Sequence, residues 1–271
     1  MWEIKRNTIR QFDGLANEDP VCAAHGRCIS SALTHTLRRL RVLLNSSESL
    51  IVLDAGCGTG EVSNAIANES RIVVGVDFSQ RMIEHSRMFS CKSNFSNTEF
   101  LICDIENLPF RENCFDRVMC SSVFQYMNLP GMTASLRECK RVTKNQGFIV
   151  FRVKNSMSLQ GCPYILQPGI LIRIVIREIL RAARGLKTSS ETSEKGFHYR
   201  HLATYRAMIK KLGMGSVDHE STFGLWTGRA TGRLIDKLTR VESFLFERRV
   251  KYPFGADCFL RVKVAKEGLR R

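Results

Sequence analysis

The sequence predicts an α/β fold with a doubly wound, mostly parallel sheet, and three observations carry this prediction. Residues 50–60 read LIVLDAGCGTG, a short apolar run followed by glycines at alternate positions. A run rich in β-branched residues is typical of a buried parallel strand, and glycine allows the sharp turn after it. Helical spacing of apolar residues begins at Glu61, and further strand and helix patterns alternate up to residue 153. Strand, glycine turn and helix in this order form a cofactor cradle at the carboxyl end of a parallel sheet.

The glycine spacing excludes two common kinds of nucleotide-binding turn. A dinucleotide turn needs G-x-G-x-x-G, but here the third glycine, Gly60, arrives one residue early. Glu61 follows it, and an acidic residue at a helix start repels a pyrophosphate. No Gly-Lys-Ser/Thr follows either, so a phosphate loop of that type is also excluded.

The pattern hydrophobic-D-x-G-C-G-T-G resembles the first motif of the class I S-adenosylmethionine-dependent methyltransferases. This resemblance implies S-adenosylmethionine as the cofactor, which has an amino-acid moiety and no phosphate. Its ammonium group would meet Asp54 or a nearby carbonyl, and its carboxylate would meet N–H groups of the turn. The turn is formed by Gly56, Cys57, Gly58 and Gly60. The resemblance also implies a seven-stranded sheet with an antiparallel last strand and a helical insertion.

The second expected strand, residues 71–76, leads into Asp77-Phe78-Ser79. An acidic residue about 20 positions beyond the glycine turn is placed to accept hydrogen bonds from both ribose hydroxyls, so Asp77 is the expected ribose ligand. Phe78 is expected to pack against the adenine, with Met82 one helical turn further on. The alternative for Asp77 is a helix N-cap.

The third and fourth expected strands supply the rest of the cofactor site. After residues 99–103, the resemblance implies that Asp104 contacts the adenine amino group and that Ile105 flanks the ring. The end of the fourth strand, residues 115–120, lies nearest the reactive methyl in the resembled family, which makes Ser121 a further candidate. Asp116 opens that strand on the side away from the site and is expected to be structural.

The remaining elements suggest four parts in the chain. A helix over 136–142 and a strand over 148–153 complete the core, and a polar loop is expected over 186–195. A helix over 202–212, ended by Gly213, precedes the last strands at 216–222 and 257–265. The parts are an N-terminal helical flap (1–47), the S-adenosylmethionine-binding core (48–153), a substrate-cap insertion (154–200), and the C-terminal part of the sheet with a basic helical insertion (201–271).

Composition adds expectations about location and partners. The chain has 271 residues, 44% of them hydrophobic, without a membrane-spanning run or a signal-peptide pattern, so we expect a cytoplasmic protein. Its ten cysteines form no C-x-x-C pair, so no metal site is expected. Residues 1–150 hold 17 basic and 16 acidic side chains, whereas residues 151–271 hold 24 and 10, a net charge of +14. This asymmetry favours an anionic partner, and a solvated basic face is the alternative.

The cap insertion contains a helical pattern over 169–184 with arginines on one face. Such a helix suits an anionic membrane surface, which would make the protein a peripheral membrane protein. It also suits a lid over the active-site cleft, because amphipathic helices usually face their own core. A second basic, amphipathic helix is expected over 228–249.

The acceptor is the least determined part of the prediction. A hydroxyl or carbon acceptor needs a general base, for which Tyr126, His198 and His201 are candidates; their alternatives are packing for Tyr126 and a surface position for the histidines beside Arg200. The segment from strand three to strand five resembles the small-molecule subgroup that includes the ubiquinone and menaquinone methyltransferases. Gln125-Tyr126 stand where quinone enzymes more often have a histidine pair, which counts against a quinone.

We therefore expect methyl transfer to a small-molecule or lipid-like acceptor. No Asn/Asp/Ser-Pro-Pro-Tyr/Phe motif follows strand four and no RNA-binding module is visible, so nucleic acid is the less favoured substrate. Two alternatives remain open: an RNA methyltransferase that uses the basic C-terminal half, and a non-catalytic S-adenosylmethionine-binding module.

Overall fold

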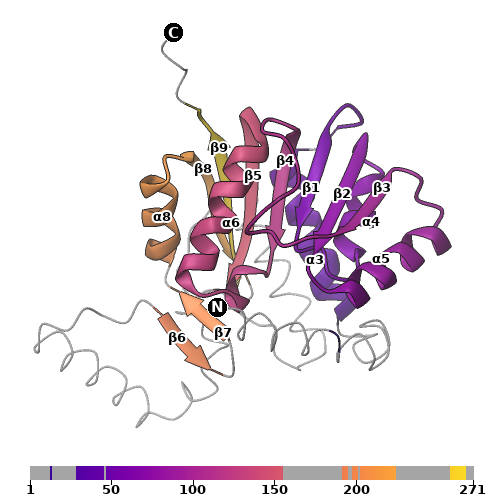
Figure 1. Cartoon of the computed structure of the whole chain (residues 1–271), viewed down its shortest axis with the longest axis horizontal. Coiled ribbons are helices and arrows are strands. Elements are labelled where there is room, and N and C mark those ends of the chain that lie inside the picture. The colour runs from indigo at the N-terminus through magenta and orange to yellow at the C-terminus, as the bar shows by residue number, and fades with distance from the viewer. Residues whose placement is uncertain are drawn as a thin grey trace, which may run out of the picture.

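The computed structural model describes residues 13, 29–45, 47–154, 191–194, 197–200, 202–223 and 257–266. Seven of the described strands form one sheet in the order β3-β2-β1-β4-β5-β9-β8, with helices on both faces (Figure 1). These strands are β1 (Ile51–Ala55), β2 (Ile72–Asp77), β3 (Thr98–Ile102), β4 (Phe115–Ser121), β5 (Thr143–Lys154), β8 (Gly215–Phe223) and β9 (Asp257–Val264). The helices are α3 (Ile29–Leu44), α4 (Glu61–Ala67), α5 (Gln80–Lys92), α6 (Leu129–Val142) and α8 (Leu202–Lys211), with the 3-10 turn η1 (Phe124–Tyr126). A separate hairpin pairs β6 (Glu191–Glu194) with β7 (Phe197–Arg200).

Strand pairing confirms the predicted fold class. β1 pairs in parallel with β2 on one side and with β4 on the other, and the parallel pairing continues to β3 and β5. β9 runs antiparallel to both β5 and β8. The strand order reverses between β1 and β4, and such a switch point opens a crevice for a ligand at the carboxyl ends of the strands.

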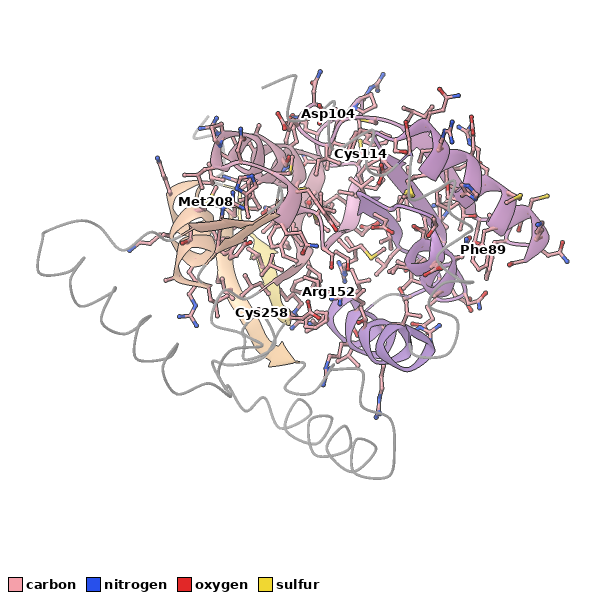
Figure 2. The ribbon with its side chains drawn as sticks, turned by 90° about the horizontal axis from the view of Figure 1, so that it is seen from below. Phe89, Asp104, Cys114, Arg152, Met208 and Cys258 are labelled. Atoms are coloured by element: carbon pink, nitrogen blue, oxygen red, sulfur yellow. The ribbon has the colours of Figure 1, made fainter. Side chains whose placement is uncertain are left out.

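Helices cover both faces of the sheet, so the central strand β1 is buried on both of its sides, whereas the edge strand β3 leaves Leu101 and Ile102 exposed. Val52 of β1 packs in one core with side chains from α3 and α4, among them Leu40 and Ile66. The neighbouring Leu53 points to the opposite face, as alternation along a strand requires. There it joins a core built with α6 and α8, whose members include Leu136. In Figure 2, the labelled Met208 marks helix α8 and the labelled Phe89 marks helix α5.

Helix α6 begins seven residues earlier than the sequence predicted, at Leu129 instead of residue 136. The side chain of Asn128 accepts a hydrogen bond from the N–H of Gly131 and so caps the helix. Pro130 lies in the first turn, where its missing N–H has no helical partner to lose. The proline and glycine in this segment therefore belong to a helix start and not to a turn.

Two strands also differ from the prediction. Thr143 already pairs with Phe115, before a register shift leads to the pair Arg117 and Phe148, so β5 begins five residues early. Part of the expected loop over 186–195 is strand β6, because its backbone pairs with β7 and does not need an apolar pattern. Helix α8 ends as predicted, with Gly213 at φ 55°.

Several expected elements lie outside the described residues, namely the helices over 169–184 and 228–249 and most of the first half of the expected N-terminal flap over 1–47. Within the described segments, no helix is both long and apolar enough to cross a bilayer. The described core nevertheless brings the carboxyl ends of β1, β2, β3 and β4 to one edge of the sheet, where the predicted site residues lie. At the opposite edge, Asp116 accepts from the N–H of Ile51 and from Lys144, in agreement with its expected structural role.

Candidate functional site

The turn after β1 depends on three glycines with left-handed backbone conformations. Gly56, Gly58 and Gly60 have φ values of 84°, 54° and 76°. Residues that carry a side chain rarely adopt this backbone conformation, so the turn requires glycine. The N–H groups of Gly56 and Cys57 both donate to the carbonyl of Val76, at 2.8 and 2.9 Å, which ties the turn to the end of β2.

The three glycines face different surroundings. A Cβ at Gly56 would clash with a methyl group of Val123, and one at Gly60 would lie 2.8 Å from the Cβ of Ser86. A Cβ at Gly58 would meet no atom of the described residues within 4 Å. Gly56 and Gly60 therefore allow close packing within the protein, whereas Gly58 borders open space. The backbone at Gly58 is the part of the turn that a ligand can approach closely.

Asp77, at the carboxyl end of β2, lies against this turn. One carboxylate oxygen accepts from the N–H of Gly58 at 3.0 Å, and the other accepts from the N–H of Ser79 at 3.0 Å. Burial raises the pKa of Asp77, and these N–H groups act against the rise. A carboxylate has about four acceptor positions, so Asp77 can still accept hydroxyl groups of a ligand. The helix N-cap of α5 is Ser79, so the alternative role of Asp77 as that N-cap is not what the structure shows.

Asp54 is a buried carboxyl group beside the same turn. It is 1% exposed and accepts a hydrogen bond of 2.6 Å from the hydroxyl of Ser63. Burial raises the pKa of Asp54 to about 7, and the negative charge of Asp77 adds to the rise. Among the described residues, no ion pair involves Asp54. A cationic group bound nearby would compensate its buried charge, so the residue fits the ammonium or sulfonium of S-adenosylmethionine.

The other predicted cofactor residues lie around this turn and the following strand ends. Phe78 directly follows Asp77, and Met82 lies in the first turn of α5, where its N–H donates to Ser79. Asp104 and the buried Ile105 begin the loop after β3, where the carboxylate of Asp104 accepts from the N–H of Glu106. The roles of these residues toward adenine stay predictions.

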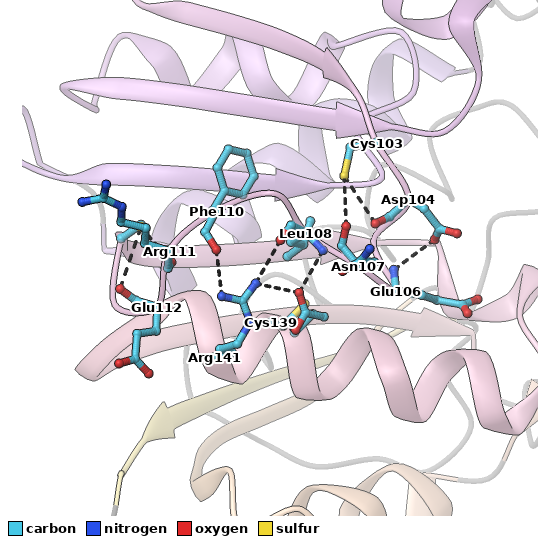
Figure 3. A network of polar contacts seen from close by, with 12 residues as sticks. Cys103, Asp104, Glu106, Asn107, Leu108, Phe110, Arg111, Glu112, Cys139 and Arg141 are labelled. Carbon is cyan, nitrogen blue, oxygen red and sulfur yellow. Dashed lines mark hydrogen bonds and ion pairs between the residues drawn. The ribbon is translucent and has the colours of Figure 1, made fainter.

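The loop between β3 and β4 is held in place by α6 (Figure 3). Arg141 donates to the carbonyls of Phe110 and Leu108, at 2.7 and 2.9 Å, and pairs with Glu138 at 2.7 Å. Glu138 in turn accepts from the N–H of Leu108 at 2.8 Å. The helix thus fixes the loop that begins with Asp104.

The segment after β4 turns sharply across the end of the sheet. Ser121 is the last residue of β4, and Ser122 adopts a left-handed backbone with φ 61°, which is uncommon for residues other than glycine. Val123 then packs on Gly56, and the turn η1 follows with Tyr126 half-buried at its end. Ser121 and Tyr126 therefore lie on a segment that contacts the glycine turn, and their expected roles near the reactive methyl group stay predictions.

The hairpin strand β7 packs against η1, which brings part of the predicted cap to this segment. His198 of β7 is partly buried, and His201 lies outside the described residues. Arg200 is 1% exposed, and its guanidinium donates to the carbonyls of Phe124 and Met127 at 2.9 and 2.6 Å. The sequence did not indicate that Arg200, the neighbour of these histidines, would be buried. The sequence contains no signal for this contact, because the bonded residues are more than 70 positions apart.

The matches to known proteins fall mainly on the core segment of the chain. Residues 52–147 match a family model described as a methyltransferase domain. A malonyl-[acyl-carrier protein] O-methyltransferase of Erwinia pyrifoliae is 33% identical over 150 residues, which is 53% of this chain and 55% of that protein. A demethylmenaquinone methyltransferase of Thermotoga maritima is 28% identical over 151 residues, or 55% and 62% of the two chains. The matches thus span little more than half of these relatives.

The solved structures agree on the fold. A Haemonchus contortus phosphoethanolamine N-methyltransferase in complex with phosphoethanolamine and S-adenosylhomocysteine superposes with a TM-score of 0.64 at 16% identity. The superposition covers 98% of this chain and 50% of that one. At this level of identity, the likeness concerns the fold alone.

Proposed function

We propose that residues 52–147, which match a methyltransferase domain, bind the methyl donor, and that the protein transfers the methyl group of S-adenosylmethionine to a small or lipophilic acceptor. The observation that supports this most is the open side of Gly58, bordered by Asp77 and by the buried Asp54. This arrangement suits a ligand that carries both hydroxyl groups and a positive charge.

The chain's own residues have distinct proposed roles in binding the donor. Asp77 accepts hydrogen bonds from the ribose hydroxyls, and Asp54 compensates the cationic end. The N–H groups of Gly56, Cys57, Gly58 and Gly60 already donate to protein acceptors, so the donor's carboxylate would have to share or replace one of these contacts. Phe78, Met82 and Ile105 border the adenine, whose amino group meets Asp104. When bound, the donor supplies an activated methyl group on a sulfonium. The protein then holds the acceptor in line with that group, which can provide much of the rate.

Proton removal from the acceptor is the second proposed task of the site. Tyr126 of η1 and His198 of β7 lie on elements that pack against each other, so either can face the same acceptor. His201 follows β7 and remains a third candidate. A hydroxyl or carbon acceptor needs such a base, because the proton must leave as the methyl group arrives.

Two features support a small or lipophilic acceptor. Two relatives are named for acyl-carrier-bound malonyl and quinone substrates, and both match the core segment. The charge of +14 in residues 151–271 supports docking on an anionic membrane surface, where a lipophilic acceptor would be found. Segment 1–47 is proposed as a flap over the donor, and segment 154–200 is proposed as a cap over the acceptor. Asp13, the one described residue near the start of the flap, accepts a hydrogen bond from Ser79 at 2.6 Å.

One labelling experiment tests the proposal. The purified protein is incubated with cell extract and S-adenosylmethionine carrying a labelled methyl group, and the extract is then separated into lipid, small-molecule, protein and RNA fractions. We expect label in the lipid or small-molecule fraction, and none with the Asp77→Asn variant. Label in RNA would favour the RNA methyltransferase instead. Donor binding without any labelled product would favour a non-catalytic binding module.

The membrane part of the proposal needs its own measurement. Binding to vesicles with and without anionic lipid, and to RNA, is compared over a range of salt concentrations. We expect binding to anionic vesicles that weakens with salt. A steep salt dependence for RNA without vesicle binding would contradict the membrane proposal.

A further inference from the structure

Arg200 has an unusual position for an arginine in a predicted cap. Its side chain is 1% exposed, and its two terminal nitrogens reach two different carbonyls of the turn around η1. A guanidinium presents donors in a rigid planar fork, so it can hold two carbonyls at once, whereas a lysine provides a single point of charge. Arg200 therefore joins β7 to a segment that lies more than 70 residues earlier in the chain.

The turn that Arg200 holds is also fixed by other contacts. Val123 packs on Gly56 of the donor turn, and the ring of Phe124 packs on Phe151 of β5 with 5.4 Å between centroids. Arg200 adds the third attachment, and this one comes from the cap hairpin. The position of η1 is thus set jointly by the donor turn, the sheet and the cap.

Gln125 gives η1 a feature that points to a ligand. Its side chain is 7% exposed, and its carbonyl oxygen Oε1 is buried without a hydrogen-bond partner among the described residues. A buried acceptor that lacks a partner is costly, and such groups in native proteins usually find a partner in a water or a ligand. Gln125 lies on the turn that begins directly after Val123, which itself contacts the donor turn.

We propose that Arg200 is a positioning residue that fixes η1, so that the amide oxygen of Gln125 accepts a hydrogen bond from the acceptor. The acceptor then carries a hydroxyl or N–H group close to the atom that is methylated. This inference deepens the proposed function and rests on it. Arg200 acts through the backbone of η1, and Gln125 contacts the substrate itself.

The test compares four variants with the unaltered full-length chain. Arg200→Met removes the fork, Arg200→Lys keeps the charge, Gln125→Leu removes the acceptor oxygen, and Arg137→Met removes an exposed arginine of α6 as a control. Each protein is assayed for S-adenosylmethionine binding by calorimetry and for amide hydrogen exchange in peptides covering 121–128. Methyl transfer is measured against increasing amounts of the extract fraction that the unaltered protein labels.

We expect Arg200→Met to keep donor affinity within about two-fold, to exchange faster at 121–128 and to lose at least ten-fold in transfer efficiency. Arg200→Lys should recover part of both losses, and Gln125→Leu should raise the half-saturating amount of extract without changing the exchange. Methyl transfer at the wild-type level by Arg200→Met would overturn the inference. If Arg200→Met does not fold, wild-type transfer by Arg200→Lys would overturn it. So would faster exchange spread equally over β2 and β3, because that would be a general loss of stability. Failure of the unaltered protein to bind the donor would instead refute the proposed function.

Discussion

Replacement of Gly58 by alanine tests whether the open side of the turn binds the donor, because the added methyl group should lower donor affinity more than it disturbs packing. Gly58 has φ 54°, and a Cβ at this position meets no atom within 4 Å in the part of the chain that the structure describes. The substitution therefore affects folding only through the left-handed backbone, at a cost of about 1–2 kcal/mol. For a chain of this size, we expect the melting temperature to fall by roughly 2–8 °C. The added methyl group points into the open space assigned to the donor, so donor affinity should fall at least ten-fold, or about 1.4 kcal/mol.

Gly60→Ala is the matched control for this prediction. Its backbone is also left-handed, with φ 76°, but the added Cβ would lie 2.8 Å from the Cβ of Ser86 and 2.9 Å from the ring of Phe100. Overpacking adds about 1–3 kcal/mol to the backbone cost, so this variant should be the less stable of the two. Thermal unfolding and calorimetric titration with S-adenosylmethionine measure both effects. Wild-type donor affinity in Gly58→Ala, or equal destabilisation by both variants, would refute the assignment of the open side.

Two further predictions concern the carboxyl group of Asp54 and the loop between β3 and β4. Asp54 has a pKa of about 7 in the folded protein against 3.8 as the ordinary value, so its contribution to stability is full below about pH 4 and is lost as the pH rises through about 7. Urea unfolding between pH 4 and 8 should show this fall, of up to about 4 kcal/mol, and Asp54→Asn should remove it. Donor binding near pH 6 should release a proton from Asp54, seen as a dependence of the binding heat on the buffer; the same heat in every buffer would contradict this. Arg141→Met should cost about 1–3 kcal/mol, because it leaves the carbonyls of Leu108 and Phe110 without their charged donor, and it should speed hydrogen exchange over 104–114. Unchanged exchange there would show that α6 does not hold the loop.

Short-range patterns were sufficient to predict the central part of the fold. The apolar run before Asp54 and the alternate glycines define strand, turn and helix within one continuous segment. Asp77 could be placed because parallel strands end at one edge of the sheet, and its position follows from the length of the intervening helix. The sequence and the structure agree here because each feature depends on neighbouring residues.

Contacts between distant segments could not be predicted in the same way. Arg200 follows a polar stretch with the pattern of a solvated segment, and its burial depends on carbonyls of η1. The early start of α6 depends on the cap by Asn128, and the residues of β6 form a strand only because β7 lies beside them. Buried polar groups such as Gln125 carry no hydrophobic pattern, so periodicity does not reveal them.

The measurement that tests the central claim most directly is calorimetric titration of S-adenosylmethionine into the unaltered protein and into Asp77→Asn. Asp77 is the last residue of β2 and lies against the open turn at Gly58. Its carboxylate oxygens are the proposed partners of the ribose. Hydrogen bonds to a charged group contribute about 1.5–3 kcal/mol each, so the account predicts saturable binding that weakens at least ten-fold in the folded variant. No heat of binding from the unaltered protein, or equal affinity in both proteins, would contradict it.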